Sequence, residues 1–346
     1  MYSQIDVKSN IKDYCVKFVD KKDIYKLIGE DYYLAVVDSN VANYFPEFGL
    51  GDLIVVDTNE DLKSWNGLET IFNKFIEKKV NTQTKLVVIG GGVLQDAVGF
   101  CASVYCRGIE YYLVPTTLLS QIDSCVGGKT SVNYGSRKNI LGTFYPPKEI
   151  LICEDFLYGL SKEDFCSGLG ELFKFDILRN KISSSEIDDL ISGNNSVSKH
   201  IYESLKYKIS ILEIDEFDKH ERKFLNFGHT FGHALEITSN YKLSHGYAVV
   251  IGCLIALEVS KSLFDTHINS KATEIAKNLL SQTCPIEEKW FDFDNLMECV
   301  KSDKKNTGCV NMVLIKDSQP VIQKIEDYSI IKTALGKVYE TIRLCN

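Results

Sequence analysis

The chain has 346 residues, of which 45% are hydrophobic and 25% are charged, and its formal net charge is −8. This length and composition predict about two ordinary globular domains. The acidic balance argues against nucleic acid and anionic membranes as partners. Apolar runs such as 248–257 are far shorter than the roughly 20 residues of a membrane span, and the polar segment 1–13 lacks the apolar part of a signal peptide. We therefore expect a cytoplasmic protein.

The 11 cysteines do not occur in Cys-x-x-Cys pairs, and Cys101 and Cys106 are the two that lie nearest in sequence. Zinc ribbons and thioredoxin-like redox motifs both need closer spacing. In a reducing compartment such cysteines are small, buried, reduced side chains.

The first half of the chain alternates short apolar runs with helical segments. The runs predicted as strands are residues 33–37, 53–56, 85–89 and 111–114, and the segments with helical periodicity are 68–76 and 95–105. Strands separated by helices predict a parallel sheet with crossover helices. We therefore predict an α/β nucleotide-binding domain over residues 1–155.

After residue 155 helical patterns dominate. Helices are predicted at residues 165–178, 200–216, 230–238 and 247–263, and one strand pair is predicted near 312–315 and 320–325. The polar stretch 192–198 is predicted as a surface loop. Residues 156–346 are therefore expected to form a mostly helical domain that binds metal and substrate.

A triple-glycine turn, Gly90-Gly91-Gly92, stands between a predicted strand and a predicted helix. Glycine allows close backbone approach to a ligand, and the N-terminus of the following helix offers free N–H groups to a phosphate. The turn differs from the G-x-G-x-x-G fingerprint, so that motif is not invoked. Asp38 ends an earlier strand, where an acidic residue often binds a ribose hydroxyl.

Three of the six histidines, His229, His233 and His245, fall within 17 residues. The first two are four residues apart and so share a helix face. Zinc accepts imidazoles together with a carboxylate and keeps an open position when it is catalytic, and Glu171 is a candidate carboxylate. Thr230 replaces the glutamate of His-Glu-x-x-His, which excludes that metalloprotease motif.

Basic residues recur within apolar or glycine-rich stretches, where cations seldom lie without anionic partners. They are Arg107, Lys129, Lys138, Lys174, Lys208 and Arg222. Arginine suits carboxylate and phosphate, and lysine acts as a point charge. The recurrence of these cations indicates a pocket for a small anionic substrate.

Two further segments are residues 114–130 (VPTTLLSQIDSCVGGKT) and 137–147 (RKNILGTFYPP). In both segments the chain resembles the 3-dehydroquinate synthases of the sugar-phosphate cyclase superfamily. The triple-glycine turn, Gly170-Glu171-x-x-Lys174 and the segment 226–233 (NFGHTFGH) follow in the order and spacing of that family. The match runs from about Asp38 to about Lys305.

The resemblance implies roles for particular residues. Glu171, His229 and His245 would bind a divalent metal, usually Zn²⁺ and otherwise Co²⁺, with His233 beside it as a proton relay. The implied NAD-binding residues are Asp38, Glu60, Lys63, Gly90, Gly91, Gly92, Asp96, Thr116, Thr117, Lys129 and Lys138. The implied substrate-binding residues are Asp123, Lys129, Lys138, Asn139, Lys174, Lys208, Arg222, Asn226 and Lys305, the last in preference to Lys304. Arg107 would reach the phosphate across a homodimer interface.

The family's reaction explains this collection of residues. The resemblance implies a small sugar-acid phosphate, 3-deoxy-D-arabino-heptulosonate 7-phosphate, as substrate of a carbon–oxygen lyase. Transient oxidation by NAD acidifies a C–H bond, phosphate leaves, the hydride returns, and an internal aldol reaction closes the ring to 3-dehydroquinate. The reaction belongs to the shikimate pathway of aromatic amino acid biosynthesis.

Some positions depart from the family pattern. Tyr247 stands where a glutamate usually follows the last metal histidine, which predicts the loss of a carboxylate that tunes the metal. Gly159 replaces a threonine and weakens an expected nucleotide contact, and Gln95 replaces a commoner small residue. These departures indicate a divergent branch of the family.

Three alternatives compete with this interpretation. Related cyclases take sedoheptulose 7-phosphate or glucose 6-phosphate, which lack a carboxylate; Lys208 and Arg222, the positions implied in carboxylate binding, favour the heptulosonate. Metal-dependent alcohol dehydrogenases share a similar two-domain layout but do not need so many cations. A binding protein without catalytic activity would need no metal-type histidines beside a nucleotide turn.

Overall fold

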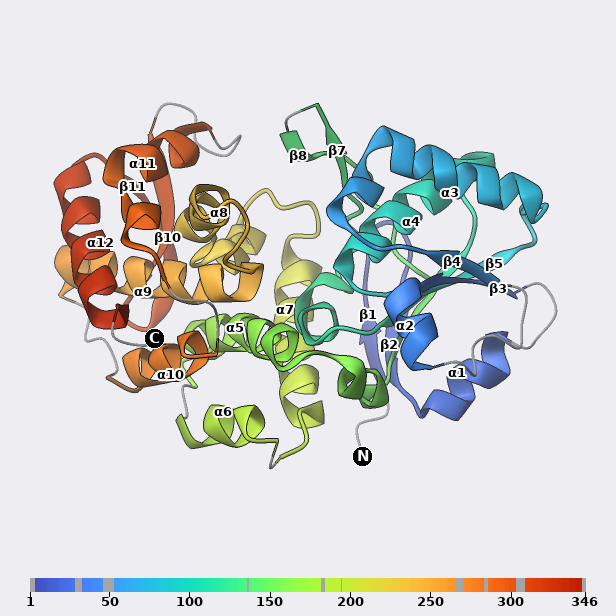
Figure 1. Ribbon diagram of the computed structural model, residues 1–346, viewed down its shortest axis with the longest axis horizontal. Helices are drawn as coiled ribbons and strands as arrows, with labels where there is room; N and C mark the ends of the chain where they lie inside the picture. The colour runs from blue at the N-terminus through green and yellow to red at the C-terminus, as the bar shows by residue number, and fades with distance from the viewer. Residues whose placement is uncertain are drawn as a thin grey trace. The chain divides into compact units, whose positions relative to one another are not determined.

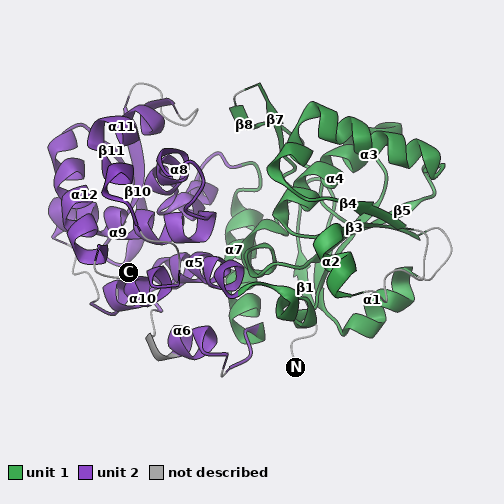
Figure 2. Cartoon of the chain, in the orientation of Figure 1, with its two compact units in different colours: residues 1–161, 198–217 green, residues 162–197, 218–346 purple. Residues whose placement is uncertain are grey.

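The computed structural model describes residues 4–28, 33–45, 53–135, 137–181, 184–193, 195–265, 270–282, 286–302 and 309–343. The chain divides into two compact units (Figure 2). Unit 1 comprises Met1–Ser161 and Ser198–Phe217, and unit 2 comprises Lys162–Val197 and Asp218–Asn346. The predicted division at residues 155 and 156 therefore differs from the structure, chiefly because the chain returns to unit 1 for residues 198–217.

This return is explained by helix α7 (Ser198–Ile214), which packs on strand β1 (Gln4–Val7) and on the short helical turn η4 (Ser120–Ser124). Just beyond β1, the backbone N–H groups of Lys8 and Asn10 donate to Glu213 (3.0 Å) and Glu216 (2.7 Å). These contacts join residues more than 200 positions apart, so local periodicity could not show them.

Unit 1 is built on a seven-stranded sheet with the order β1-β2-β9-β6-β5-β3-β4 (Figure 1). Its strands after β1 are β2 (Tyr14–Phe18), β3 (Tyr33–Asp38), β4 (Leu53–Val56), β5 (Lys85–Gly90), β6 (Tyr111–Pro115) and β9 (Glu149–Ile152). Only the β1–β2 pair is antiparallel. The predicted parallel α/β fold is therefore confirmed, and the sequence had missed β1, β2 and β9.

Helices cover both faces of the sheet, as a parallel sheet requires. Helices α1 (Lys21–Ile28) and α2 (Ser39–Tyr44) lie on one face, and α3 (Trp65–Glu77) and α4 (Gly92–Val104) lie on the other (Figure 1). On the first face Ile24 of α1 and Val41 of α2 pack against alternate strand residues such as Val37, Ile89 and Val114. The central strands are buried throughout, which explains their unbroken apolar sequence.

The sheet order brings three strand ends together. Strands β3 and β5 are neighbours, but the chain goes from β3 to β4 on one side and from β5 to β6 on the other side. Ligands of open α/β sheets bind at the carboxyl ends of the strands at such a switch point. The residues placed there are Asp38 after β3, the turn Gly90–Gly92 after β5, and Thr116 and Thr117 after β6. A separate hairpin, β7 (Val132–Tyr134) and β8 (Arg137–Leu141), carries Lys138 and Asn139.

Unit 2 packs helices around α9 (His245–Phe264). The helices α5 (Lys162–Leu178), α8 (His229–Thr238), α10 (Ser270–Leu280) and α12 (Tyr328–Ile342) all contact α9, and so does strand β10 (Val310–Lys316). Strand β11 (Gln319–Ile325) pairs with β10, and α6 (Ser184–Ile191) and α11 (Phe293–Ser302) complete the unit. The predicted mostly helical second half and its strand pair are confirmed.

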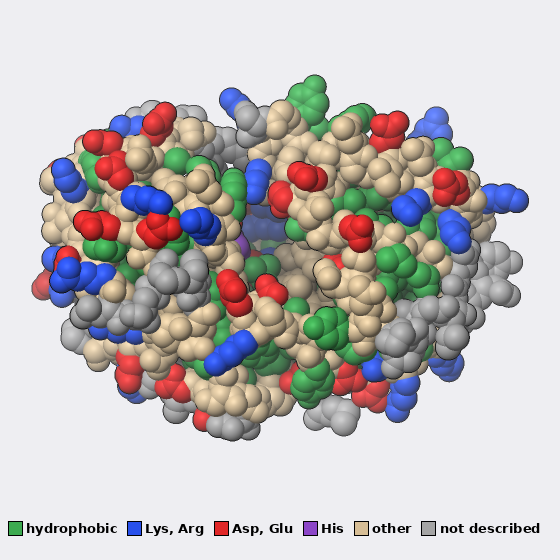
Figure 3. All heavy atoms as spheres, in the orientation of Figure 1, with side chains coloured by type: hydrophobic (Ala, Val, Ile, Leu, Met, Phe, Trp, Pro, Cys, Tyr) green, Lys and Arg blue, Asp and Glu red, His purple; other side chains and the backbone are tan. Residues whose placement is uncertain are grey.

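Helix α9 is long and apolar enough to cross a membrane, judged by length and composition alone. However, 72% of its most apolar 18-residue window is buried inside the protein. Its apolar sequence is thus explained by its central position in unit 2. On the face shown in Figure 3, acidic and basic side chains are interspersed over each unit and do not form one basic field.

Candidate active site

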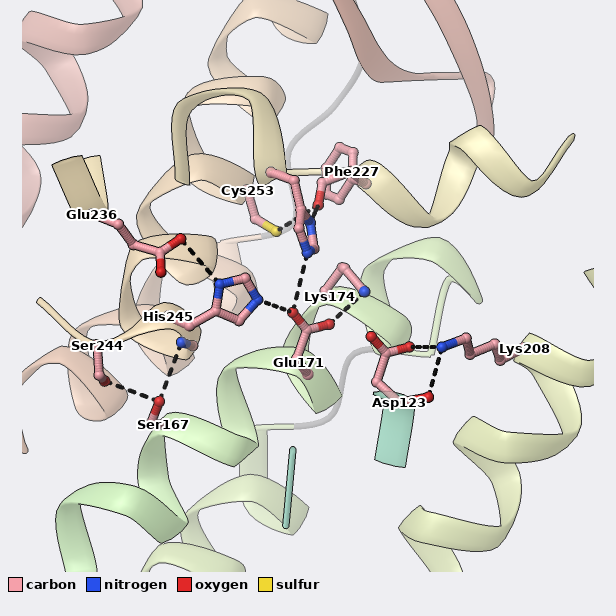
Figure 4. Close-up of polar contacts among 12 residues, drawn as sticks. Asp123, Ser167, Glu171, Lys174, Lys208, Phe227, Glu236, Ser244, His245 and Cys253 are labelled. Carbon is pink, nitrogen blue, oxygen red and sulfur yellow. Dashed lines mark hydrogen bonds and ion pairs between the residues drawn. The ribbon is translucent and has the colours of Figure 1, made fainter. Parts of the chain in front are cut away.

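Three side chains from three helices of unit 2 meet at one point. Glu171 lies in the middle of α5, whereas His229 and His245 are the first residues of α8 and α9. Glu171 Oε1 lies 3.4 Å from His229 Nε2 and 3.3 Å from His245 Nε2 (Figure 4). Tetrahedral coordination with metal–ligand bonds of about 2.0–2.1 Å places ligand atoms about 3.3–3.4 Å apart. The geometry therefore suits a divalent cation held by these three residues.

Close contacts at glycines allow these helices to approach. A Cβ atom on Gly170 would lie 2.3 Å from Gly246 O, and one on Gly246 would lie 1.6 Å from Ser167 O. The hydroxyl of Ser167 also accepts hydrogen bonds from Gly246 N–H (3.2 Å) and from Ser244 Oγ (2.9 Å). Gly170 precedes Glu171 and Gly246 follows His245, so this contact places two of the three candidate ligands together.

Replacing Gly246 with alanine should separate α5 from α9. We expect Gly246→Ala to lower the free energy of unfolding by about 1–3 kcal/mol or more, because the added methyl group overlaps Ser167 O. Gly336→Ala on α12 is the control: no atom lies within 4 Å of its added Cβ, and alanine in an exposed helix is favoured by up to about 1 kcal/mol. Chemical denaturation of both variants checks this prediction, and equal stabilities would contradict it.

The cluster has the charge distribution of a metal site. Burial opposes the ionisation of Glu171, but the Lys174 ammonium and the two imidazoles hold the pKa of this carboxyl well below its usual range. Burial lowers the pKa of His229 although Glu171 opposes it, which favours the neutral imidazole that a metal requires. For His245 burial is outweighed by Glu171 and Glu236, which raise its pKa to about 10, so a metal that binds here must displace the proton of this imidazole.

The oxygens of Glu171 are the atoms that fit a cation most clearly. Both are buried, and neither accepts a hydrogen bond of regular geometry from the residues that the structure describes, although Lys174 Nζ and the imidazoles lie within ion-pair distance. A buried carboxylate in this state is costly unless a cation completes its surroundings. The donor set of one carboxylate and two imidazoles is one that Zn²⁺ accepts.

The other nitrogen of each imidazole is also bound. His229 Nδ1 lies 3.1 Å from Phe227 O, and His245 Nδ1 lies 3.1 Å from Glu236 Oε2. These contacts leave both Nε2 atoms directed at Glu171. Sequence reasoning missed Glu236, although it lies three residues after His233 on α8 and so on the same helix face.

The structure corrects the prediction that Tyr247 removes a carboxylate from the metal surroundings. The Tyr247 ring is fully buried, and its hydroxyl lies 3.3 Å from both Glu163 O and Gln282 O. Glu236 supplies the carboxylate that contacts His245. Tyr247 therefore serves the packing of α9, and the carboxylate partner comes from α8.

Replacing Glu236 with glutamine should weaken metal binding without unfolding the protein. The amide removes the negative charge beside His245 Nδ1, and partners of this kind change metal affinity by roughly 10–100-fold. A competition titration of the metal-free protein against a chromophoric chelator measures this change. Glu274→Gln on the exposed surface of α10 is the control, and an affinity of Glu236→Gln equal to that of this control would contradict the prediction.

His233 lies one helical turn after His229, beside the cluster. Its ring centroid is 5.3 Å from that of His229 and 5.9 Å from that of His245. His233, Glu236 and His245 also place ligand atoms within 4.8 Å of one another. His233 is therefore close enough to exchange a proton with a molecule bound at the cation.

The residues around Gly90–Gly92 that are expected to bind a nucleotide lie at the carboxyl ends of strands β3, β5 and β6 in unit 1. Gly91 is the N-cap residue of α4 and makes no side-chain capping hydrogen bond, so the N-terminal N–H groups of this helix can donate to a phosphate. A Cβ atom on Gly91 would lie 3.0 Å from Thr117 Cγ2, which is tighter than usual contact. Thr116 N–H donates to Gly90 O (3.2 Å), and Asp38 Oδ1 accepts from Asn40 N–H (2.8 Å).

Two departures from the family pattern also lie at this edge. The side-chain amide of Gln95 donates to Gly90 O (3.0 Å), so it braces the glycine turn. A Cβ atom on Gly159 would lie 3.4 Å from the Tyr44 ring. The Tyr44 side chain thus occupies the space beside Gly159 into which a larger residue would extend.

The structure distributes the other predicted residues between the units. Glu60, Lys63, Asp96, Arg107, Asp123, Lys129, Lys138, Asn139 and Lys208 lie in unit 1, and Lys174, Arg222, Asn226 and His233 lie in unit 2. Lys208 Nζ lies 2.8 Å from Asp123 Oδ1 and donates to Asp123 O at 2.6 Å (Figure 4). Lys305 lies outside the described residues.

Three of these residues have informative surroundings. Lys129 lines a small cavity with Gly92 and Asp96. Arg222 is 5% exposed within the short helix η6 (Glu221–Asn226). Arg107 is exposed and lies just after α4. Its φ of 67° places its backbone in the left-handed region.

Comparison with known proteins adds an independent finding. Residues 53–167 match the family described as 3-dehydroquinate synthase N-terminal, and residues 168–306 match 3-dehydroquinate synthase C-terminal. A 3-dehydroquinate synthase of Clostridium tetani (strain Massachusetts / E88) is 37% identical over 274 residues, covering 77% of this chain and 73% of that protein. One of Chlamydia felis (strain Fe/C-56) is 37% identical over 362 aligned positions, covering 95% of each chain.

Solved structures show the same fold. A 2-deoxy-scyllo-inosose synthase complexed with carbaglucose-6-phosphate, NAD⁺ and Co²⁺ has a TM-score of 0.83 at 22% identity, covering 97% of this chain and 99% of the other. The 2-epi-5-epi-valiolone synthase of Streptomyces hygroscopicus subsp. jinggangensis 5008, with NAD⁺ and Zn²⁺ bound, has a TM-score of 0.82 at 23% identity and the same coverage. An iron-containing alcohol dehydrogenase of Thermotoga maritima is less similar, with a TM-score of 0.55 at 15% identity and coverage of 94% and 97%. Together with the family match over both units, these findings show that the chain belongs to the 3-dehydroquinate synthase family.

Proposed function

We propose that this protein converts 3-deoxy-D-arabino-heptulosonate 7-phosphate into 3-dehydroquinate and phosphate. The observation that supports this most strongly is the convergence of Glu171, His229 and His245 at tetrahedral ligand spacing in a chain of this family. The reaction is a phosphate-eliminating cyclisation, which classes the enzyme as a carbon–oxygen lyase of the shikimate pathway. We place it in the cytoplasm and as a homodimer.

The proposed cofactors are NAD and Zn²⁺, with Co²⁺ as a substitute. The cyclases with the same fold were solved with NAD⁺ and one of these metals. Glu171, His229 and His245 would hold the metal, and the edge of the sheet around Gly90–Gly92 would hold the nucleotide. When bound, NAD supplies reversible hydride acceptance and the metal supplies Lewis-acid polarisation of substrate oxygens.

The residues of the chain bind and orient the substrate and handle its protons. His233 is proposed to exchange a proton beside the metal ligands. Lys174 places a buried ammonium against Glu171, and it would also meet an anionic substrate oxygen. Asp123 holds Lys208 by its carboxylate and by its backbone oxygen, which orients the ammonium.

Substrate choice is the finer part of the proposal. Lys208 and Arg222 are buried cations, 7% and 5% exposed, and both are proposed to bind the substrate carboxylate. Sedoheptulose 7-phosphate and glucose 6-phosphate lack the carboxylate, so these two cations favour the heptulosonate. The remaining proposed phosphate and sugar contacts come from Arg107, Lys129, Lys138, Asn139, Asn226 and Lys305.

A substrate panel tests the proposal. The purified protein is incubated with NAD, Zn²⁺ or Co²⁺, and one of the three sugar phosphates, and released phosphate and product mass are measured. We expect phosphate release from the heptulosonate alone, with a product of the mass of 3-dehydroquinate. Release from sedoheptulose 7-phosphate or glucose 6-phosphate instead would assign the protein to another cyclase activity.

A further inference from the structure

Lys63 lies at the centre of a polar cluster in unit 1 that joins three separate elements. Its side chain is 5% exposed, and its Nζ atom donates to Asp96 Oδ2 (2.7 Å), Ser131 Oγ (2.8 Å) and Asn139 Oδ1 (2.5 Å). An ammonium group has three N–H donors, so each of them has an acceptor within the protein. Lys63 thus joins the end of the short helix η2 (Glu60–Lys63) to α4 and to the β7–β8 hairpin.

The contact with Lys63 determines which way the Asn139 amide faces. The oxygen and nitrogen of an amide are distinguished by their partners, and an ammonium can only donate. The atom of Asn139 beside Lys63 Nζ must therefore be the oxygen. Ser131 Oγ lies 2.8 Å from the same oxygen and 2.6 Å from Asp96 Oδ2, so its single proton serves one of these two acceptors.

The backbone around Asn139 is held as firmly as its side chain. Asn139 has a φ of 52°, in the left-handed region that asparagine tolerates better than most residues. Its backbone N–H donates to Asn133 Oδ1 (2.8 Å), and Asn133 Nδ2 donates to Glu60 Oε1 (2.7 Å). Two sets of side-chain hydrogen bonds therefore hold the hairpin against η2, and Asn139 lies in both.

We propose that Lys63 and Ser131 are positioning residues that hold the Asn139 amide so that its Nδ2 group donates to the phosphate of the substrate. With Oδ1 held against Lys63, the opposite end of the amide is a donor, which is the polarity that a phosphate oxygen needs. Asn139 is exposed, and the adjacent Arg137 and Lys138 add positive charge. The inference rests on the proposed function and assigns Lys63 a role on the substrate side, where the family resemblance implied a contact with NAD.

The substitution Asn139→Asp tests the polarity of this contact. The carboxylate has the same shape and still accepts from Lys63 and Ser131, but it loses the Nδ2 donor and repels phosphate. We expect the KM for the sugar phosphate and the Kd for inorganic phosphate of the NAD-loaded protein to rise by about 10–100-fold, as loss of a hydrogen bond to a charged group predicts. The Kd for NAD should change by less than about 3-fold, and the Tm should not fall.

The substitution Ser131→Ala tests whether Ser131 affects phosphate binding through its contact with Asn139. It leaves the Lys63–Asp96 pair intact, whereas Lys63→Met would leave Asp96 without its cation and endanger folding. Ser131→Ala should raise the KM for the sugar phosphate by about 3–10-fold and should add nothing in the background of Asn139→Ala. Ser262→Ala on the exposed face of α9 is the matched control and should leave both constants unchanged.

Three results would overturn the inference. They are an unchanged Kd for inorganic phosphate in Asn139→Asp, a loss of NAD affinity as large as the loss of phosphate affinity, and full additivity of Ser131→Ala with Asn139→Ala. The phosphate titration needs no turnover. If the wild-type protein does not use the heptulosonate, the proposed function fails, while phosphate binding still decides the role of Asn139.

Discussion

Replacing His229 with alanine should give a folded protein that retains no divalent metal and turns over at least about 10³-fold more slowly. His229 Nε2 is one of the two imidazole nitrogens within 3.4 Å of Glu171 Oε1. Loss of one ligand leaves a carboxylate and a single imidazole, too few to retain the metal tightly. Because His229 is the first residue of α8 and lies at its N-terminus, alanine there need not disturb the helix.

Metal content after dialysis, helix content and phosphate release should be measured on the same preparation of His229→Ala. His220→Ala removes an exposed histidine and serves as the control, which should keep full metal content and activity. A His229→Ala protein that is fully metallated and active would show that His229 is not a ligand. Loss of helix content would instead point to a structural role of this residue.

Replacing Lys174 with methionine should have the second large effect, on stability. Lys174 and Glu171 are 1% and 0% exposed and form a buried ion pair one helical turn apart on α5. Removing one member of a buried pair costs about 3–5 kcal/mol, because the other charge stays buried without compensation. Lys174 also lowers the pKa of Glu171, so without it the carboxyl becomes easier to protonate.

Metal should partly reverse this loss of stability, since a divalent cation supplies the positive charge that Lys174 provided. A ligand present at 1,000 times its dissociation constant stabilises the folded state by about 4 kcal/mol. We therefore expect the gain in Tm on adding Zn²⁺ to be larger for Lys174→Met than for the wild type. Lys242→Met is the control. Lys242 forms an ion pair with Glu287, and its side chain is 61% exposed. Exposed ion pairs contribute about 0–1 kcal/mol to stability. Equal Zn²⁺ effects in the wild type and Lys174→Met would contradict the account.

The sequence predicts those parts of the fold that are fully buried. Strands β3, β5 and β6 are unbroken apolar runs because helices cover both of their faces. Strand β9 has only four residues, directly after Pro146-Pro147-Lys148, and β1 and β2 have mixed polarity at one side of the sheet. Their identity as strands depends on their neighbours in the sheet, which a local pattern does not contain.

The division into units was predicted less well for the same reason. Helix α7 has an ordinary helical pattern, but the pattern does not say which unit it joins. That is decided by contacts with β1 and η4, and by Glu213 and Glu216 accepting from the segment after β1. Such contacts between distant residues leave no periodic signal in either segment.

The candidate site was predicted in unequal parts. The i, i+4 spacing of His229 and His233 shows a shared helix face. His245 joined them by its nearness in sequence and Glu171 only as a candidate carboxylate, and the family resemblance then implied that both are ligands. Glu236 had a usable signal, its place on the same face of α8. Ser131 had none, because a serine just before a short strand is ordinary until the structure places it between Asp96 and Asn139.

The ratio of phosphate to NADH produced in one reaction tests the central claim most directly. The claim is that the metal cluster of unit 2 and the nucleotide edge of unit 1 serve a cyclisation without net oxidation. With catalytic NAD, Zn²⁺ and excess heptulosonate phosphate, we predict many equivalents of phosphate per NAD and no steady rise in NADH absorbance. One NADH accumulating per substrate consumed, with no phosphate released, would contradict the account and indicate a dehydrogenase.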